Sequence, residues 1–217
     1  MTSVRLSGNS QQLRVIAEAR EDVLVEGTAR VEMDGERTTI DDVRGSLVVR
    51  VPNESDLVIG ATSGQVVVKG ALGAVAVTTV SGRIVIEQAA SVDARTDSAQ
   101  VTIGQASGAC RVRSESGQIK IGSCAGVDAA TASGRIVLRE VGGAVRAHCV
   151  SGRIDVEMAV AADADAETVS GHITIALPNG VRPYHLDEIG QEAVRPDGYD
   201  CTIRAVSQTG RIDVSNR

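Results

Sequence analysis

The sequence has almost no aromatic side chains. Its 217 residues include two tyrosines, no phenylalanine and no tryptophan, although 42% of the residues are hydrophobic. A core of this size without rings requires a geometry that suits small and β-branched side chains, such as two closely spaced sheets. Because hydrophobic residues are plentiful and charged ones make up 23%, the chain is globular rather than disordered.

Several other features are missing, and each absence excludes a class of protein. No apolar run approaches the length of a membrane-spanning helix, so we expect no membrane span. The net charge of −6 and the pI near 5.1 argue against nucleic acid or an anionic membrane as a partner. The first residues, Met1 to Gly8, lack the basic stretch and apolar segment of a secretion signal, which predicts a cytoplasmic location.

The four cysteines do not form a recognisable site. Cys110, Cys124, Cys149 and Cys201 include no C-x-x-C pair, so their spacing suits neither a zinc site nor a redox motif. In a reducing cytosol we expect four buried thiols that act as small hydrophobic side chains.

What the sequence does contain is an internal repeat. Ser-Gly dipeptides recur every 17 to 19 residues, Ser98-Ala99 fills the one gap in the series, and Thr209-Gly210 ends it. The dipeptides begin at residues 63, 81, 116, 133, 151 and 170. This regularity predicts one structural unit repeated along the chain.

Each repeat alternates apolar and polar residues with a period of two, which indicates strands. The third and fifth residues after each serine are aliphatic, as in Ile84 and Ile86, and a second alternating segment follows, as in Val92 and Ala94. A unit of about 18 residues cannot bury a core alone, whereas stacked units can. We therefore predict an all-β fold, a right-handed parallel β-solenoid of about nine coils.

Equivalent positions of successive repeats form columns when the repeats are stacked, and two such columns have structural interpretations. A small polar residue stands two places before each corner, and we expect its hydroxyl to bond the turn backbone. This column holds Thr79, Thr96, Ser114, Thr131, Cys149 and Thr168. Between the inward residues of the second strand the charge alternates in sign, which predicts a ladder of opposite charges. Its members are Asp93, Arg111, Asp128, Arg146 and Asp165.

The two ends of the chain depart from the repeat. Residues 1–44 alternate without the 18-residue rule and carry a hairpin signal at Asp34-Gly35, so we predict an antiparallel meander that caps the first coil. Residues 45–217 then form the solenoid domain, with a loop insertion at 176–200.

The insertion at 176–200 is the candidate interaction loop, because it holds three of the four prolines and both tyrosines. We name Tyr184, His185, Asp187 and Tyr199 as its candidate contact residues. The simpler interpretation is a cover over one sheet edge. No capping element follows the last strand, so the C-terminal coil is expected to associate end to end.

The sequence offers no set of residues for catalysis. A phosphate-binding glycine loop and a G-x-S-x-G nucleophile elbow are both absent, and His148, His172 and His185 occupy unrelated columns. We therefore predict no catalytic, cofactor-binding or metal-binding residues, and no enzyme activity.

The recurring S-G-x-I-x-I, followed by G-x-V-x-A-x-T, resembles the bacterial β-strand-repeat family labelled putative adhesin, also called the toastrack domain. The closing segment Cys201 to Val214 is similar to that family's last repeat. The resemblance covers roughly residues 45–217 and implies this fold, no defined catalytic residues, and, by the family label, a surface protein.

Three functions remain in competition. The leading hypothesis is a cytoplasmic, non-enzymatic scaffold that binds a protein partner or itself. A polymer-forming cytoskeletal solenoid resembling bactofilins is the alternative within that class. A carbohydrate-active solenoid enzyme is the contrasting class, but such enzymes gather acidic residues on one sheet, whereas here the acids alternate with arginine.

Overall fold

The structure is a computed structural model that describes residues 2–186 and 197–217, and its regular elements there are all β-strands. The all-β prediction is confirmed. The strands are β1 (Ser3–Glu18), β2 (Leu24–Asp34), β3 (Arg37–Pro52), β4 (Asp56–Ala61), β5 (Gln65–Ala106), β6 (Ala109–Ser123), β7 (Gly126–Val141), β8 (Val145–Met158), β9 (Ala164–Leu177), β10 (Pro183–Leu186), β11 (Cys201–Thr209) and β12 (Ile212–Asn216).

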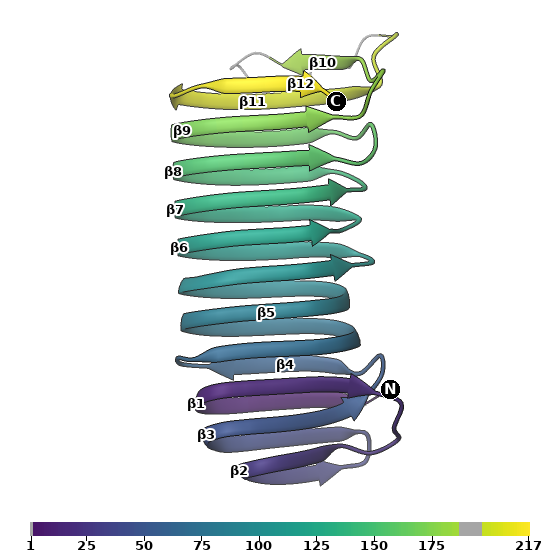
Figure 1. The fold of residues 1–217 in the computed structure, drawn as a ribbon, viewed down its shortest axis with the longest axis vertical. Coiled ribbons are helices and arrows are strands. Elements are labelled where there is room, and N and C mark those ends of the chain that lie inside the picture. The colour runs from purple at the N-terminus through teal and green to yellow at the C-terminus, as the bar shows by residue number, and fades with distance from the viewer. Residues whose placement is uncertain (1, 187–196) are drawn as a thin grey trace.

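The repeats lie one above another as rungs, each formed by a strand before the Ser-Gly corner and a strand after it (Figure 1). Strands β5 to β9 pair in parallel, each with the next. The register aligns equivalent residues of successive repeats, so that Ile136 pairs with Ile154 and Ile154 with Ile173. The column continues to Ile212, which pairs with Ile173.

The core lies between the two sheets and contains aliphatic side chains. Ile119, Ile136, Ile154 and Ile173 are all 0% exposed. Among the described residues none of the buried side chains is aromatic, as expected of a core that suits small and β-branched side chains. On the outside, Asp93, Arg111, Asp128, Arg146 and Asp165 align in register, as the alternating signs predict.

Most corners carry glycine because successive rungs approach closely there, and Ala99 is the exception. A Cβ atom on Gly82 would overlap the carbonyl oxygen of Gly64, and one on Gly152 would overlap that of Gly134. Three of the small residues before the corners bond the turn backbone as expected, and the first is Thr79, whose Oγ1 donates to the Ser81 carbonyl at 3.1 Å. Ser114 and Thr131 repeat this bond at 3.1 and 3.3 Å.

The N-terminal region differs from the prediction. The hairpin at Asp34-Gly35 is confirmed, since β2 and β3 pair antiparallel. An antiparallel meander over residues 1–44 is wrong for β1, which pairs in parallel with β3 on one side and with β4 and β5 on the other. The strand order is β2-β3-β1-β4, so β1 is itself a rung and β3 continues past residue 44.

The reason lies in the side chains of β1. Val4, Leu6, Leu13 and Val15 are buried and point inward like those of the other rungs. Parallel insertion between β3 and β4 gives these side chains partners above and below, whereas a cap would have buried them on one side only.

The cysteines act as the small hydrophobic side chains that were predicted. All four are free and buried. A hydrogen bond with Cys124, together with burial, raises the pKa of the Cys110 thiol. Burial also raises the pKa of Cys149. Cys110 and Cys149 are therefore protonated and poorly nucleophilic, whereas the hydrogen bond with Cys110 lowers the pKa of Cys124.

Candidate functional site

The candidate site is the C-terminal end of the stack, where the regular repeat stops. After β9 the chain turns at residues 178–181 and enters β10, which pairs in parallel with β11. Tyr184 lies beside Thr202 and His185 beside Ile203 in this pairing. The insertion therefore places β10 over the outer edge of β11 (Figure 1).

Two of the candidate loop residues contact each other. The ring centroids of Tyr184 and Tyr199 lie 5.3 Å apart, with the planes tilted by 60°. Tyr199 is 43% exposed and His185 is also exposed. The remaining candidate residue, Asp187, lies outside the described residues. The structure thus brings three of the four predicted contact residues to one end of the stack.

The base of the insertion is held by Arg182 and Asp200. The amide of Arg182 donates to Asp200 Oδ2 at 2.8 Å, and the amide of Asp200 donates to the Arg182 carbonyl at 2.9 Å. The two side chains also form an ion pair of 3.7 Å. This closed base fixes where the two tyrosines project.

The neighbouring strand β12 leaves part of the core open. Ile212 is 40% exposed, although Ile173 and Ile154 in the same column are 0% exposed. Within the described residues β12 pairs with β9 alone, so its outer edge has no strand beside it. A half-exposed core column beside an unpaired strand edge is a surface that favours association.

Sequence reasoning missed several residues that fasten this end. Asn216 Nδ2 donates to the Val181 carbonyl at 2.9 Å, and Arg217 forms an ion pair with Glu157. Arg204 Nη1 contacts Asp165 Oδ1 at 2.7 Å, and this hydrogen bond raises the pKa of Arg204. For Arg204 the repeat carried a signal, because it extends the column of alternating charge beyond Asp165.

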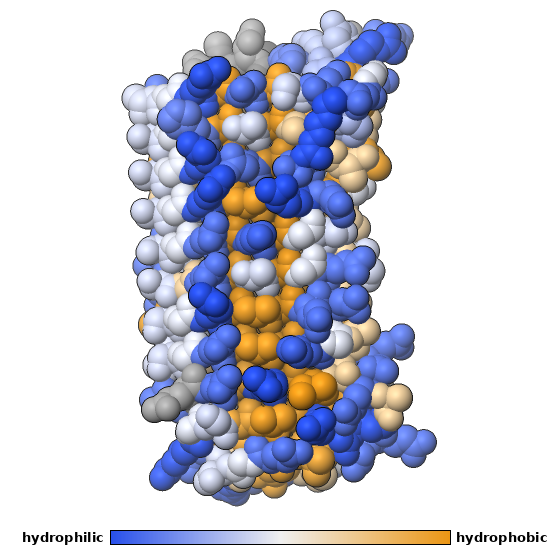
Figure 2. Space-filling model, viewed as in Figure 1, coloured by the Kyte–Doolittle hydropathy of each residue, from blue (hydrophilic) through white to orange (hydrophobic). Residues whose placement is uncertain are grey.

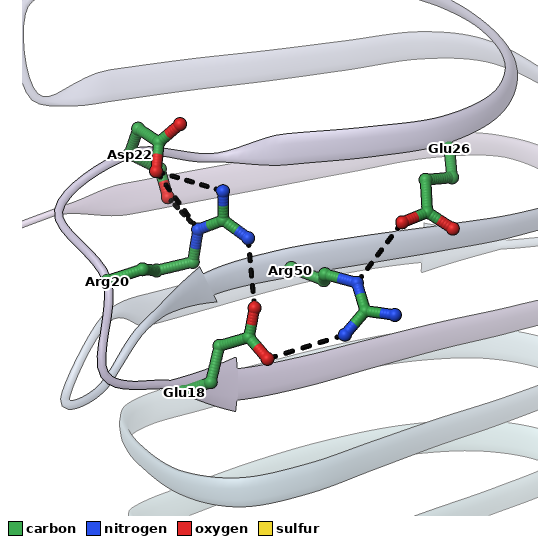
Figure 3. Close-up of polar contacts among 5 residues, drawn as sticks. All are labelled: Glu18, Arg20, Asp22, Glu26 and Arg50. Atoms are coloured by element: carbon green, nitrogen blue, oxygen red, sulfur yellow. Dashed lines mark hydrogen bonds and ion pairs between the residues drawn. The ribbon is translucent and has the colours of Figure 1, made fainter.

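At the opposite end of the stack a charged network holds the outermost strand, β2 (Figure 3). Arg20 contacts Glu18 and Asp22, each at 2.9 Å, and Arg50 contacts Glu18 at 3.3 Å and Glu26 at 3.2 Å. Hydrogen bonds raise the pKa of both arginines, mainly from Asp22 for Arg20 and from Glu26 for Arg50. The network ties β2 to β1 and β3, so an antiparallel strand covers this end.

The sheet nearer the viewer carries apolar side chains along its middle (Figure 2). They are partly shielded by long polar neighbours, as at Val137, which is only 8% exposed. The pair formed by Arg135 and Asp155 lies beside it. This stripe is therefore less open than the end of the stack.

The described residues contain no group of three or more His, Cys, Asp or Glu side chains that could hold a metal ion. In the same part of the chain, no helix is long and apolar enough to cross a membrane.

Fold and surface together define, over the described residues, an all-β repeat protein built as a stack of parallel rungs. The chain belongs to the family named Toastrack DUF4097, whose model matches residues 8–187. The family resemblance drawn from the repeat is confirmed. No curated protein matches the chain.

Two solved structures are similar to it. One is a putative adhesin from Bacteroides fragilis, with a TM-score of 0.53 and 12% identity, covering 100% of this chain and 92% of that one. The other is a putative cell adhesion protein from Clostridium sporogenes, with a TM-score of 0.27 and 8% identity over the same shares. The first likeness shows the fold alone.

Proposed function

We propose that the chain is a non-enzymatic scaffold, a right-handed β-solenoid of about nine coils, that binds a protein partner or itself through the C-terminal end of the stack. One observation carries the proposal: the core column ends at Ile212, which is 40% exposed beside an edge of β12 that no other described strand pairs. The proposed contact residues of the insertion, Tyr184, His185, Asp187 and Tyr199, belong to the same end.

The arrangement of acidic residues supports a scaffold rather than a carbohydrate-active enzyme. Asp128 pairs with Arg111 and Arg113, and Asp155 pairs with Arg135. A glycosidase would need carboxylates that converge on one substrate bond. Here these carboxylates are spread along the stack and neutralised by arginine. The repeated serines lie at structural corners, without a base beside them in the repeat pattern.

The difference between the two ends favours pairing of like ends over a bactofilin-like polymer. A head-to-tail filament needs both ends of the stack to be open. Within the described residues β2 is the outermost strand of the N-terminal end and pairs with β3 alone, but its antiparallel direction and its charged network oppose further parallel pairing. Two copies that meet through β12 would form a closed dimer.

The test uses the edge geometry of β12. The Arg211 carbonyl and the Arg217 amide both bond β9, so the amide of Val214, an odd number of residues from each, faces the free edge. Val214→Pro therefore removes a donor from the free edge and leaves the β9 ladder intact. Ser215→Ala, on the exposed face, is the matched control.

Sedimentation equilibrium and electron microscopy of the full chain give the result. We expect end association in the unchanged and Ser215→Ala proteins and at least a tenfold weaker association after Val214→Pro. Filaments would favour the polymer instead. If Val214→Pro left the association unchanged, the proposal that the C-terminal end is the contact surface would be overturned.

The cytoplasmic location predicted from residues 1–8 stays a prediction, which cell fractionation tests.

A further inference from the structure

A second surface lies on the sheet that faces away from the viewer in Figure 1, next to the Ser-Gly corners. Two outward columns run side by side there. The first, which we call the arginine column, holds Arg95, Arg113, Ala130 and His148 on successive rungs and continues to Glu167, which pairs with His148 and Arg204. The second, the acid column, lies two residues further along each strand and holds Asp97, Glu115, Ala132 and Val150.

The two acids of these columns have no ion pair within the described chain, and the two arginines are paired but remain largely exposed. Neither Asp97 nor Glu115 forms an ion pair with another described residue. Arg95 and Arg113 pair with Asp93 at 3.4 Å and Asp128 at 3.1 Å, but their side chains remain 61% and 51% exposed. Both arginines therefore keep donors directed at solvent, and both acids lack a cation.

Small and apolar residues complete the same surface. Ala130 and Ala132 form the floor of a shallow hollow of about 330 Å³ between the charged rungs and His148. In the acid column Val80, Val150 and Val169 are 48%, 44% and 37% exposed. Exposed valines at three rungs of one column, around two acids without partners, make a mixed patch of the kind that protein interfaces use.

The pattern of charge identifies the partner. A two-fold axis parallel to the stack would place the arginine column of one copy over the acid column of another, at the same rung. Arg95 would then face Asp97 of the second copy, Arg113 would face Glu115, and the two alanines would meet. A two-fold axis in the same plane but across the stack would place arginine over arginine, and repulsion would oppose it.

We propose that these two columns are a self-complementary interface through which two copies pair side by side, with their stacks parallel. The inference deepens the proposed scaffold role by naming a partner surface, and it rests on that role but not on the C-terminal end. The ion pairs lie near the rim, so the pairing is weak and weakens further as salt screens the charges.

Charge reversal tests the proposal, in full-length protein that carries Val214→Pro so that end association does not interfere. Arg95→Asp/Arg113→Glu makes both columns acidic, and Asp97→Arg/Glu115→Arg makes both basic. We expect each variant alone to dimerise at least tenfold more weakly in sedimentation equilibrium at low salt. An equimolar mixture of the two should recover dimers, because every opposed pair is then complementary.

Controls separate this interface from a general effect of charge. Lys69→Asp/Lys120→Glu changes the net charge equally on the other sheet and should leave dimerisation unchanged. The fourfold variant Arg95→Asp/Asp97→Arg/Arg113→Glu/Glu115→Arg should dimerise with itself but not with protein whose columns are unchanged. Its dimerisation with itself would show that it folds. The proposal would be overturned if the Val214→Pro protein with both columns unchanged stayed strictly monomeric at high concentration. It would also be overturned if the two reversed variants did not recover dimers when mixed.

Discussion

At the scale of single residues, the space between rungs determines which side chain a position accepts. The corner glycines illustrate this, because a Cβ on Gly134 would overlap the carbonyl oxygen of Gly117 and its φ is 150°. The small residues two places before the corners show that hydrogen bonding matters as well as space. Thr131 bonds the Ser133 carbonyl, whereas the buried hydroxyl of Thr168 has no hydrogen-bond partner among the described residues.

Replacing a corner glycine should destabilise the whole stack. We expect Gly134→Ala to lower the free energy of unfolding by about 3 kcal/mol, because two neighbouring rungs must move apart. Gly60→Ala is the control, since the nearest atom to its Cβ is the Leu6 oxygen at 3.9 Å. Urea unfolding followed by circular dichroism measures both. Equal stability of the two variants would contradict the packing described at the corner.

The two threonines should respond in opposite directions to the same change. Thr168→Val removes a buried hydroxyl that has no hydrogen bond, so we expect a gain of about 1 kcal/mol. Thr131→Val loses a bond of 3.3 Å and should cost about 1 kcal/mol. Thermal and urea unfolding of the pair provide the comparison. A loss at both positions would show that the Thr168 hydroxyl has a partner.

At the scale of strands, the period of two and the Ser-Gly spacing were sufficient to predict the rungs from β4 onward. The place of β1 could not be predicted, because it pairs between β3 and β4 and so breaks the chain order. A signal was present: Ser7-Gly8 stands between the inward pairs Val4/Leu6 and Leu13/Val15. An irregular register between Ser10 and Gln12 displaces it from the common spacing.

The candidate site was predictable only in part. The insertion stood out by its prolines and tyrosines, but nothing in the sequence paired Tyr184 with Tyr199 or left Ile212 exposed. Both depend on how β10 and β12 dock on the preceding rung. The opposed columns at Arg95 and Asp97 were also missed, because their meaning depends on which side chains lack partners in three dimensions.

The charged network should control how firmly β2 is held. Arg50→Met removes contacts to Glu18 and Glu26, so the amides of β2 should exchange hydrogen several-fold faster, while those of β7 and β8 stay protected. Arg44→Met is the control, because the one ion-pair partner of Arg44 among the described residues is the exposed Asp42 nearby. Hydrogen exchange detected by mass spectrometry or NMR distinguishes them. Unchanged exchange in β2 would mean that the network does not fasten this strand.

At the scale of the whole molecule, one claim underlies the rest: equivalent residues of successive repeats form straight columns along a single axis. The open end, the opposed charges and the cost of corner substitutions all depend on it. The exposed corner column from Ser98 through Ser133 and Ser170 to Thr209 provides positions where labels can be attached. The native cysteines are buried, so introduced exposed ones are labelled selectively.

The most direct test is the distance between spin labels on this column, measured by pulsed electron resonance in protein diluted with unlabelled chain. One label is placed at Ser98 and the second in turn at Ser133, Ser170 and Thr209. At about 4.8 Å per rung the distance should lengthen by about 10 Å from Ser133 to Ser170 and by about 5 Å more to Thr209. Distances that fail to grow with each rung would contradict the stack and everything built on it.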